Sequence, residues 1–116
     1  MLLNARFEGD IVVLSNFAGL MNDPRHFDAS RDVRDCLDQG YRKFVLELAG
    51  IREMGTSALG LLMTLTRQIR QHGGELVLSR VSREMRRFLD DMKMEEYWEV
   101  FDRVEEAEEY YRHESK

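Results

Sequence analysis

Two adjacent hydroxyl side chains, Thr56 and Ser57, follow a short turn after an apolar run and open an amphipathic pattern. The apolar run, residues 44–48, predicts a strand, and the pattern from Thr56 to about Gln71 predicts a helix. The first N–H groups of a helix lack intrahelical partners and carry a partial positive charge, so the backbone would stabilise a phosphate there. This position makes Thr56 a candidate phosphorylation switch.

The same two hydroxyls also have an ordinary structural interpretation. Threonine is favoured as the N-cap of a helix, where its replacement costs about 1 kcal/mol of stability. Ser57 would then be a first-turn residue or the cap itself, and it is a secondary phosphate acceptor behind Thr56. The residue types leave these roles open, and one side chain can fill both.

The sequence offers little support for metal or cofactor chemistry. Cys36 is the only cysteine, which excludes an internal disulfide, a Cys-x-x-Cys pair and a thiolate-rich zinc site. His26, His72 and His113 are far apart and match no His-Glu-x-x-His spacing, and no Gly-x-Gly-x-x-Gly or P-loop pattern exists. Glu47 has no partner in the sequence for acid–base work. We therefore expect no metal, no cofactor and no enzymatic activity.

The charge of the chain argues against a nucleic-acid-binding protein. Its net charge is −5 at pH 7, whereas affinity for a phosphate backbone depends on clustered Lys and Arg. One arginine-rich stretch exists, but acidic residues interleave with it, as on a solvated helix face: Arg80, Arg83, Glu84, Arg86, Arg87, Asp90 and Asp91. No apolar run of about 18 residues could span a membrane. We expect a cytoplasmic protein without direct nucleic-acid binding or membrane insertion.

The elements that must position the two hydroxyls form a single predicted domain over residues 1–116. Residues 2–7 and 11–17 predict a hairpin of two strands. Asp23 and Pro24 predict the start of a helix, with Asp23 as its cap, that ends near Gln39. The strand over residues 44–48 is apolar at nearly every position, which is typical of a central strand that is covered on both faces.

The second half of the chain also alternates between predicted strands and predicted helices. Residues 75–79 predict a strand that lies parallel to the strand over residues 44–48, because a helix joins the two. A short helix capped by Ser82, an apolar cluster over residues 97–101 and a terminal helix over residues 104–111 follow, with the glutamates of the last helix outward. The fold class is α/β, a mixed sheet of four or five strands with helices packed mainly on one face.

Laid out in this order, the chain resembles the STAS domain family of bacterial anti-sigma factor antagonists over nearly its whole length. The stretches that carry the resemblance are residues 44–51, 54–60, 73–78, 88–89 and 98–102. The family's helix start typically reads Asp-Ser-Ser/Thr-Gly-Leu-Gly. Its first hydroxyl falls on Thr56 and its second on Ser57, and Leu59 matches, whereas Gly55 replaces the Asp and Ala58 replaces the Gly.

The resemblance implies a function in partner switching. In the family, the first hydroxyl is phosphorylated by a partner that is both an anti-sigma factor and a serine/threonine kinase, and a phosphatase would reset Thr56. The implied partner-binding residues come from the helix start and from a neighbouring loop: Asn22, Asp23, Arg25, Gly55, Thr56, Ser57, Ala58 and Leu59. Asp23 has the alternative role of a helix cap.

A second interpretation of the resemblance is a STAS subunit that binds its partner constitutively, without phosphorylation. Such a subunit could be a stress-signalling scaffold or a component of a lipid-transport ATPase complex, and Gly55 and Ala58 favour it somewhat. The sequence leaves weak homodimer formation open, and it does not identify the partner or the regulated process.

Overall fold

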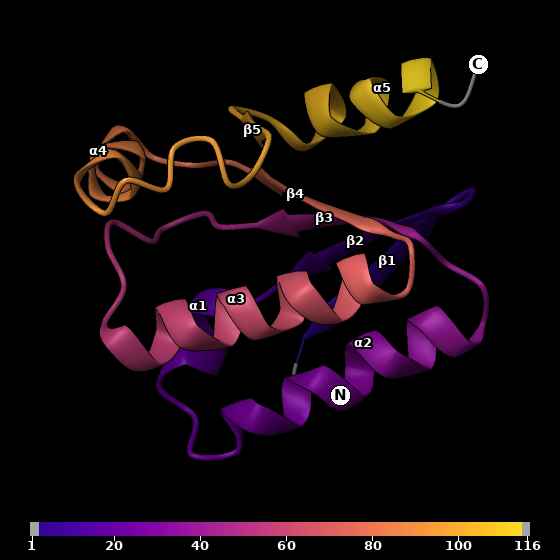
Figure 1. Cartoon of the computed structure of the whole chain (residues 1–116), viewed down its shortest axis with the longest axis horizontal. Helices are drawn as coiled ribbons and strands as arrows, with labels where there is room; N and C mark the ends of the chain where they lie inside the picture. The colour runs from indigo at the N-terminus through magenta and orange to yellow at the C-terminus, as the bar shows by residue number, and fades with distance from the viewer. Residues whose placement is uncertain (1–2, 115–116) are drawn as a thin grey trace.

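The computed structural model describes residues 3–114 of the chain. Helices and strands alternate after an initial hairpin (Figure 1). In chain order the elements are β1 (Asn4–Glu8), β2 (Ile11–Ser15), α1 (Phe17–Met21), the 3₁₀ turn η1 (His26–Asp28), α2 (Ala29–Asp38), β3 (Lys43–Glu47), α3 (Thr56–Gln71), β4 (Glu75–Ser79), α4 (Arg83–Asp91), β5 (Val100–Phe101) and α5 (Val104–Glu114).

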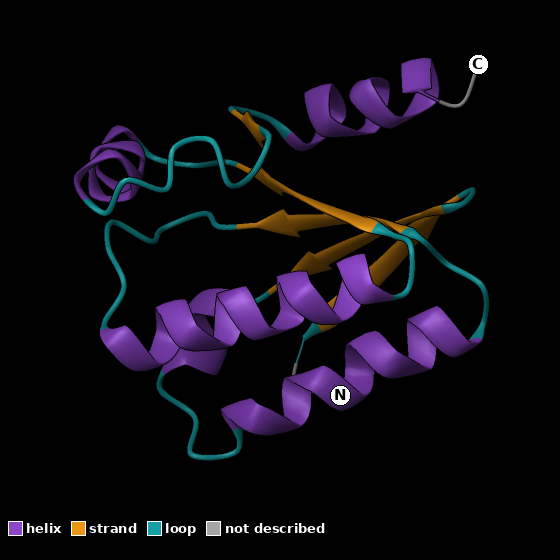
Figure 2. Ribbon diagram, in the orientation of Figure 1, coloured by secondary structure: helices purple, strands orange, loops and turns teal. Residues whose placement is uncertain are grey.

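The strands form one five-stranded mixed sheet in the order β1-β2-β3-β4-β5. Only β1 and β2 pair antiparallel, and Gly9, at φ 60°, supplies the left-handed backbone of the turn between them. Parallel pairing joins β2 to β3, β3 to β4 and β4 to β5, as helical crossovers require (Figure 2). The predicted α/β class and the mixed sheet are confirmed.

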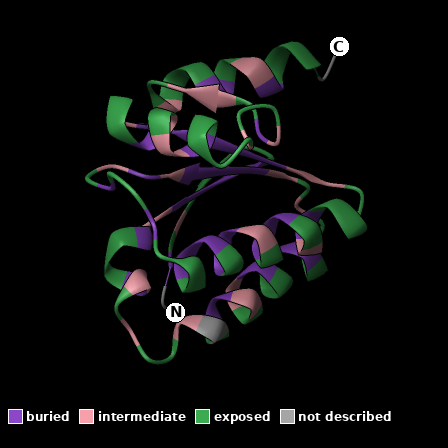
Figure 3. Cartoon of the chain, turned by 60° about the vertical axis from the view of Figure 1, so that its left-hand side comes forward, coloured by how far each residue is buried: buried purple, intermediate pink, exposed green. Residues whose placement is uncertain are grey.

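Helices cover both faces of this sheet, most of them on one side. Figure 1 shows α2 and α3 side by side under one face and α5 across the opposite face. Successive β3 side chains alternate between the two layers: Phe44 and Leu46 belong to the larger core with α2 and α3, whereas Val45 packs with α5. All three are fully buried, which confirms that this strand is covered on both faces. Figure 3 shows the same burial along the strands and the inner sides of the helices.

Helix α5 is anchored to the sheet by one buried tyrosine. The Tyr111 hydroxyl shares its single proton between the backbone oxygens of Phe44 (2.7 Å) and Glu75 (2.9 Å) and accepts from the Phe44 N–H (3.3 Å). The prediction of one inward tyrosine is confirmed. Glu108 was expected to face outward with the other glutamates, but it is 7 % exposed and lies 3.5 Å from Arg6 of β1. The arginine accounts for that burial, since a charge is buried far more readily when it is paired.

The connection between β2 and β3 differs from the prediction in where its elements begin and end. The second strand ends at Ser15 instead of Phe17, because Asn16 takes a left-handed conformation (φ 74°) and the chain then forms α1. The first strand was predicted from residue 2, which lies outside the described residues, and it begins at Asn4. Helix α2 starts at Ala29 rather than near Pro24, since residues 22–25 form a turn and η1 precedes the helix.

Candidate phosphorylation and partner-binding site

The start of α3 presents an uncapped helix end with an exposed threonine. Gly55 is the N-cap residue (φ −71°, ψ 171°), and no side chain within residues 3–114 caps the free N–H groups of the first turn. Thr56 is therefore the first helical residue and not the cap that its type suggested. Its side chain is exposed, and its hydroxyl bonds to no other residue among those that the structure describes. The oxygen is thus accessible at the positive end of a 16-residue helix.

Ser57 connects the helix start to the segment between α1 and α2. Its hydroxyl lies 3.4 Å from Nε2 of His26, and Nδ1 of that histidine lies 2.9 Å from the Asp23 carbonyl oxygen. The Asp23 contact requires a proton on Nδ1, which leaves Nε2 of a neutral imidazole as acceptor for the Ser57 hydroxyl. Sequence reasoning missed His26, because nothing local relates two residues 31 positions apart.

Asp23 and Arg25 hold the neighbouring turn together. The Asp23 carboxylate accepts from the Arg25 backbone N–H (2.8 Å), from Nε (3.1 Å) and from Nη2 (3.0 Å). Hydrogen bonding from the guanidinium, and then from the backbone, lowers the pKa of Asp23. Asp23 thus stabilises the turn and does not cap α2, whose N-cap is Asp28. Arg25 and Asn22 are exposed on this turn.

A hollow joins this turn to the loop that precedes α3. It has a volume of about 320 Å³ and lies between the end of α1 (Ala18, Met21 and Asn22) and the first residues after β3 (Gly50, Ile51, Arg52 and Glu53). Gly50 has φ +83°, a conformation that side chains disfavour, which explains a glycine at the bend. The sequence did not single out the loop residues of this hollow, since only the fold brings the two loops together.

The eight predicted partner-binding residues are not all at the surface. Gly55, Thr56, Ser57, Asn22 and Arg25 are exposed, and Asp23 is half-buried. Ala58 and Leu59 are 8 % and 7 % exposed and belong to the core beneath the helix start. Their burial follows from the helical period, which turns the third and fourth residues of α3 toward the sheet. A partner would therefore contact the exposed residues of the helix start, Gly55, Thr56 and Ser57, and not Ala58 or Leu59.

Gly55 offers a direct test of the uncapped helix start. A Cβ at this position would meet no atom within 4 Å, and the extended backbone suits any residue. We expect Gly55→Asp to raise the free energy of unfolding by about 0.5–1 kcal/mol, by capping α3 and by removing glycine's freedom in the unfolded chain. Urea unfolding checks this, with Gly55→Ala as the control that cannot cap. Equal stability of the two variants would contradict a capping effect.

Comparison with known protein families identifies the family of this chain. The model of the STAS domain matches residues 5–107 of the chain. The chain belongs to the STAS domain family. A comparison with curated protein sequences found no match.

Several solved structures share this STAS fold. Protein TM1081 of Thermotoga maritima has a TM-score of 0.78 and 24 % identity, over 97 % of this chain and 89 % of that one. An anti-sigma-factor antagonist (STAS) domain protein from Planctomyces limnophilus has a TM-score of 0.71 and 22 % identity, over 90 % and 93 % of the two chains. A sulfate transporter family protein from Wolinella succinogenes has a TM-score of 0.67 and 18 % identity, over 92 % and 88 %. STAS folds thus occur in proteins of both descriptions.

The described part of the STAS domain contains neither a cluster suited to a metal ion nor a helix suited to cross a membrane. Within residues 3–114, no group of three or more His, Cys, Asp or Glu side chains is arranged to hold a metal ion. In the same range, no helix combines the length and the apolar character that crossing a membrane requires.

Proposed function

We propose that this STAS domain is an anti-sigma factor antagonist that works by partner switching. Unphosphorylated, it binds an anti-sigma factor that is also a serine/threonine kinase; phosphorylated on Thr56, it releases that partner. The observation that carries the proposal is the exposed Thr56 hydroxyl at the uncapped start of α3, beside the turn that bears Asn22 and Arg25. A cytoplasmic location and a phosphatase that resets Thr56 belong to the same proposal.

The helix start explains how phosphorylation would leave the fold unchanged. A phosphoryl group adds about −1.5 to −2 charge and three acceptor oxygens. Next to Thr56, the free N–H groups of the first turn can donate to those oxygens, and the helix dipole favours the negative charge. The domain itself would need no refolding to accept the modification.

The same modification would penalise a partner packed over the helix start. That partner would cover a charged group and remove it from water, which costs several kcal/mol when no new bond compensates. The hollow beside Asn22 can take a side chain of the partner, and Met21 is a flexible contact at its edge. In this mechanism binding ends through local charge and bulk, and the domain performs no catalysis and needs no cofactor.

A constitutive interaction subunit is the second candidate. The observation that favours it is Gly55, which lacks the carboxylate that the family typically has next to the phosphate acceptor. Without that charge, a kinase that recognises the carboxylate would lose a contact. The STAS fold of a sulfate transporter family protein is compatible with such a subunit.

Phosphopeptide mapping separates the two candidates. The purified domain is incubated with ATP and a lysate of its own organism and analysed by mass spectrometry, alongside Thr56→Ala and Ser57→Ala variants. We expect a phosphoryl group on Thr56 in the wild type and in Ser57→Ala, and none in Thr56→Ala. If no site is modified while a control substrate in the same lysate is, or if only other residues are modified, the constitutive subunit is favoured.

A further inference from the structure

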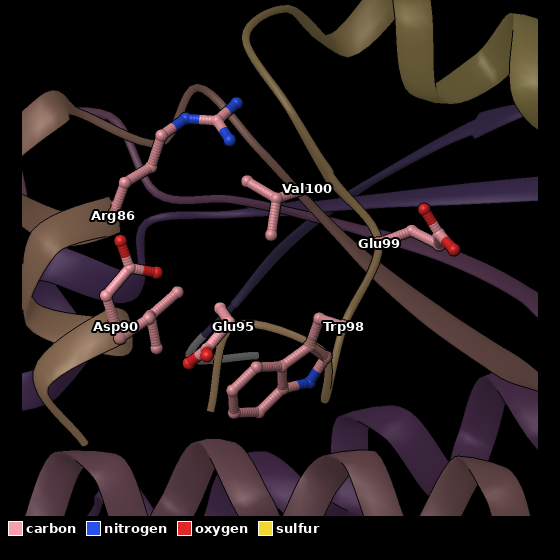
Figure 4. A pocket seen from close by; sticks show the side chains of 7 residues that line it. Arg86, Asp90, Glu95, Trp98, Glu99 and Val100 are labelled. Carbon is pink, nitrogen blue, oxygen red and sulfur yellow. The ribbon is translucent and has the colours of Figure 1, made fainter. Parts of the chain in front are cut away.

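A second hollow lies on the far side of α4 from the loop that precedes α3. It has a volume of about 290 Å³ and is formed by α4 together with the segment that leads into β5. In Figure 4, the side chains of Asp90, Glu95, Trp98 and Val100 surround one opening, while the carboxylate of Glu99 points away from it. We call this hollow the β5 cleft. It shares no lining residue with the hollow beside Asn22.

The floor of the β5 cleft is apolar and held in place. Leu89 and Trp98 line the cleft but are only 2 % and 4 % exposed, so their positions are set by the core. The Trp98 indole N–H donates to the Thr66 hydroxyl (2.9 Å), which in turn donates to the Leu62 carbonyl oxygen (2.7 Å). A ligand would therefore meet a preformed surface and would not need to order it, which lowers the cost of binding.

The rim of the β5 cleft is negatively charged. Asp90 and Glu95 are exposed, and neither forms an ion pair with any of residues 3–114. Arg86 is the cation among the lining residues, and its Nη2 lies 2.8 Å from the Asp102 carboxylate, which neutralises it. The unpaired charge at the opening is thus acidic, and charge complementarity selects a basic ligand.

The cleft also adjoins an open edge of the sheet. Strand β5 is the last in the strand order, so one side of its backbone has no neighbouring strand among the described residues. The Glu99 carbonyl oxygen accepts from the Leu78 N–H (3.0 Å) and therefore points toward β4. Because backbone groups alternate in direction along a strand, the N–H and C=O of Val100 point to the open side. Such an edge can pair with an added strand.

We propose that the β5 cleft docks an extended basic segment of a protein partner. The segment pairs with the free backbone groups of Val100, as in other cases of strand addition. A lysine or arginine side chain lays its aliphatic stem over Leu89 and Trp98 and its charged end between Asp90 and Glu95. This surface operates independently of Thr56 and gives the domain a second contact with an assembly.

Trp98 makes the test direct, because it is the only tryptophan of the chain. The probe is a pentapeptide of alternating lysine and valine, titrated while tryptophan fluorescence and backbone amide NMR shifts are recorded. We expect saturable binding with shifts at Asp90, Glu95 and Val100. The double variant Asp90→Asn, Glu95→Gln should weaken binding at least tenfold, whereas Glu96→Gln, an exposed neighbour outside the cleft, should change it less than twofold.

Several results would overturn the proposal. They are no saturable binding up to millimolar peptide, equal binding by the double variant, equal binding of a peptide with glutamate in place of lysine, and shifts that map away from β5. If the domain bound free spermine as tightly as it binds the peptide, the cleft would be assigned to a small cation and not to a polypeptide segment. Thermal melting of each variant verifies that the domain stays folded, so that a loss of binding reports on the cleft.

Discussion

The Thr56→Glu variant is expected to bind the proposed anti-sigma factor partner at least about 100-fold more weakly than the wild type does. A partner covering the helix start would have to bury the added carboxylate, at a cost of several kcal/mol, and each 1.4 kcal/mol corresponds to about a tenfold change in affinity. The domain itself should not be destabilised, because an acidic residue in the first turn of α3 interacts favourably with the helix dipole. Calorimetric titration of the wild type and of Thr56→Glu against the same anti-sigma factor measures the effect.

Thr64→Glu is the matched control for this prediction. Thr64 is exposed on the same helix, two turns from the start, and its hydroxyl donates to the Gly60 carbonyl oxygen (2.9 Å). The same substitution there adds the same charge away from the proposed surface, so affinity should stay within about twofold, which is a change of less than about 0.5 kcal/mol. If Thr56→Glu and Thr64→Glu both bind like the wild type, the domain does not switch at Thr56 and the constitutive subunit is preferred.

The largest effect on stability is expected from Tyr111→Phe. This change removes one buried hydroxyl that bonds to the backbone of both β3 and β4, at Phe44 and Glu75. We expect a loss of about 1–2 kcal/mol in the free energy of unfolding, since the variant loses the hydrogen bonds of a buried hydroxyl, while β3–β4 pairing still satisfies the two carbonyl oxygens. Burial raises the pKa of Tyr111, so the hydroxyl keeps its proton and the donor persists throughout the physiological pH range.

Tyr110→Phe supplies the control one residue earlier. The Tyr110 hydroxyl donates to the side-chain carboxylate of Glu75 (2.8 Å) at a half-buried position, so its removal should cost less than about 1 kcal/mol. Urea unfolding of both variants gives the comparison, and an unchanged slope with denaturant would indicate that only the native state was affected. Equal losses in the two variants would contradict an anchoring role for Tyr111.

Much of the fold could be predicted from the sequence because the signals are local. Helix α3 and strand β4 have the predicted bounds, since side-chain periodicity and the flanking glycines mark them. Ser82 caps α4 as predicted, with its Oγ accepting from the Met85 N–H (3.0 Å). The burial of β3 on both faces likewise followed from an almost uninterrupted apolar run.

The candidate site could be predicted only in part. The position of Thr56 at a helix start followed from neighbouring residues, whereas the identity of the cap did not, because the exact start of a helix depends on one residue's backbone angles. The bounds of the elements between β2 and β3 were predicted wrongly for the same reason. The left-handed backbone of Asn16 ends β2 early. The Asp23 carboxylate accepts from the Arg25 N–H and stabilises a turn, whereas the prediction placed it as the cap of α2.

What the sequence by itself determined is therefore the class of fold, the central strand and the place of the two hydroxyls. Only the tertiary structure brought His26 to Ser57, paired Arg6 with buried Glu108, and formed the β5 cleft from α4 and the segment before β5. The physical reason is the range of the interactions. Caps, turns and hydrophobic periodicity act between residues a few positions apart, whereas these contacts join residues that are distant in the chain and meet only when the sheet and its two helical layers pack together.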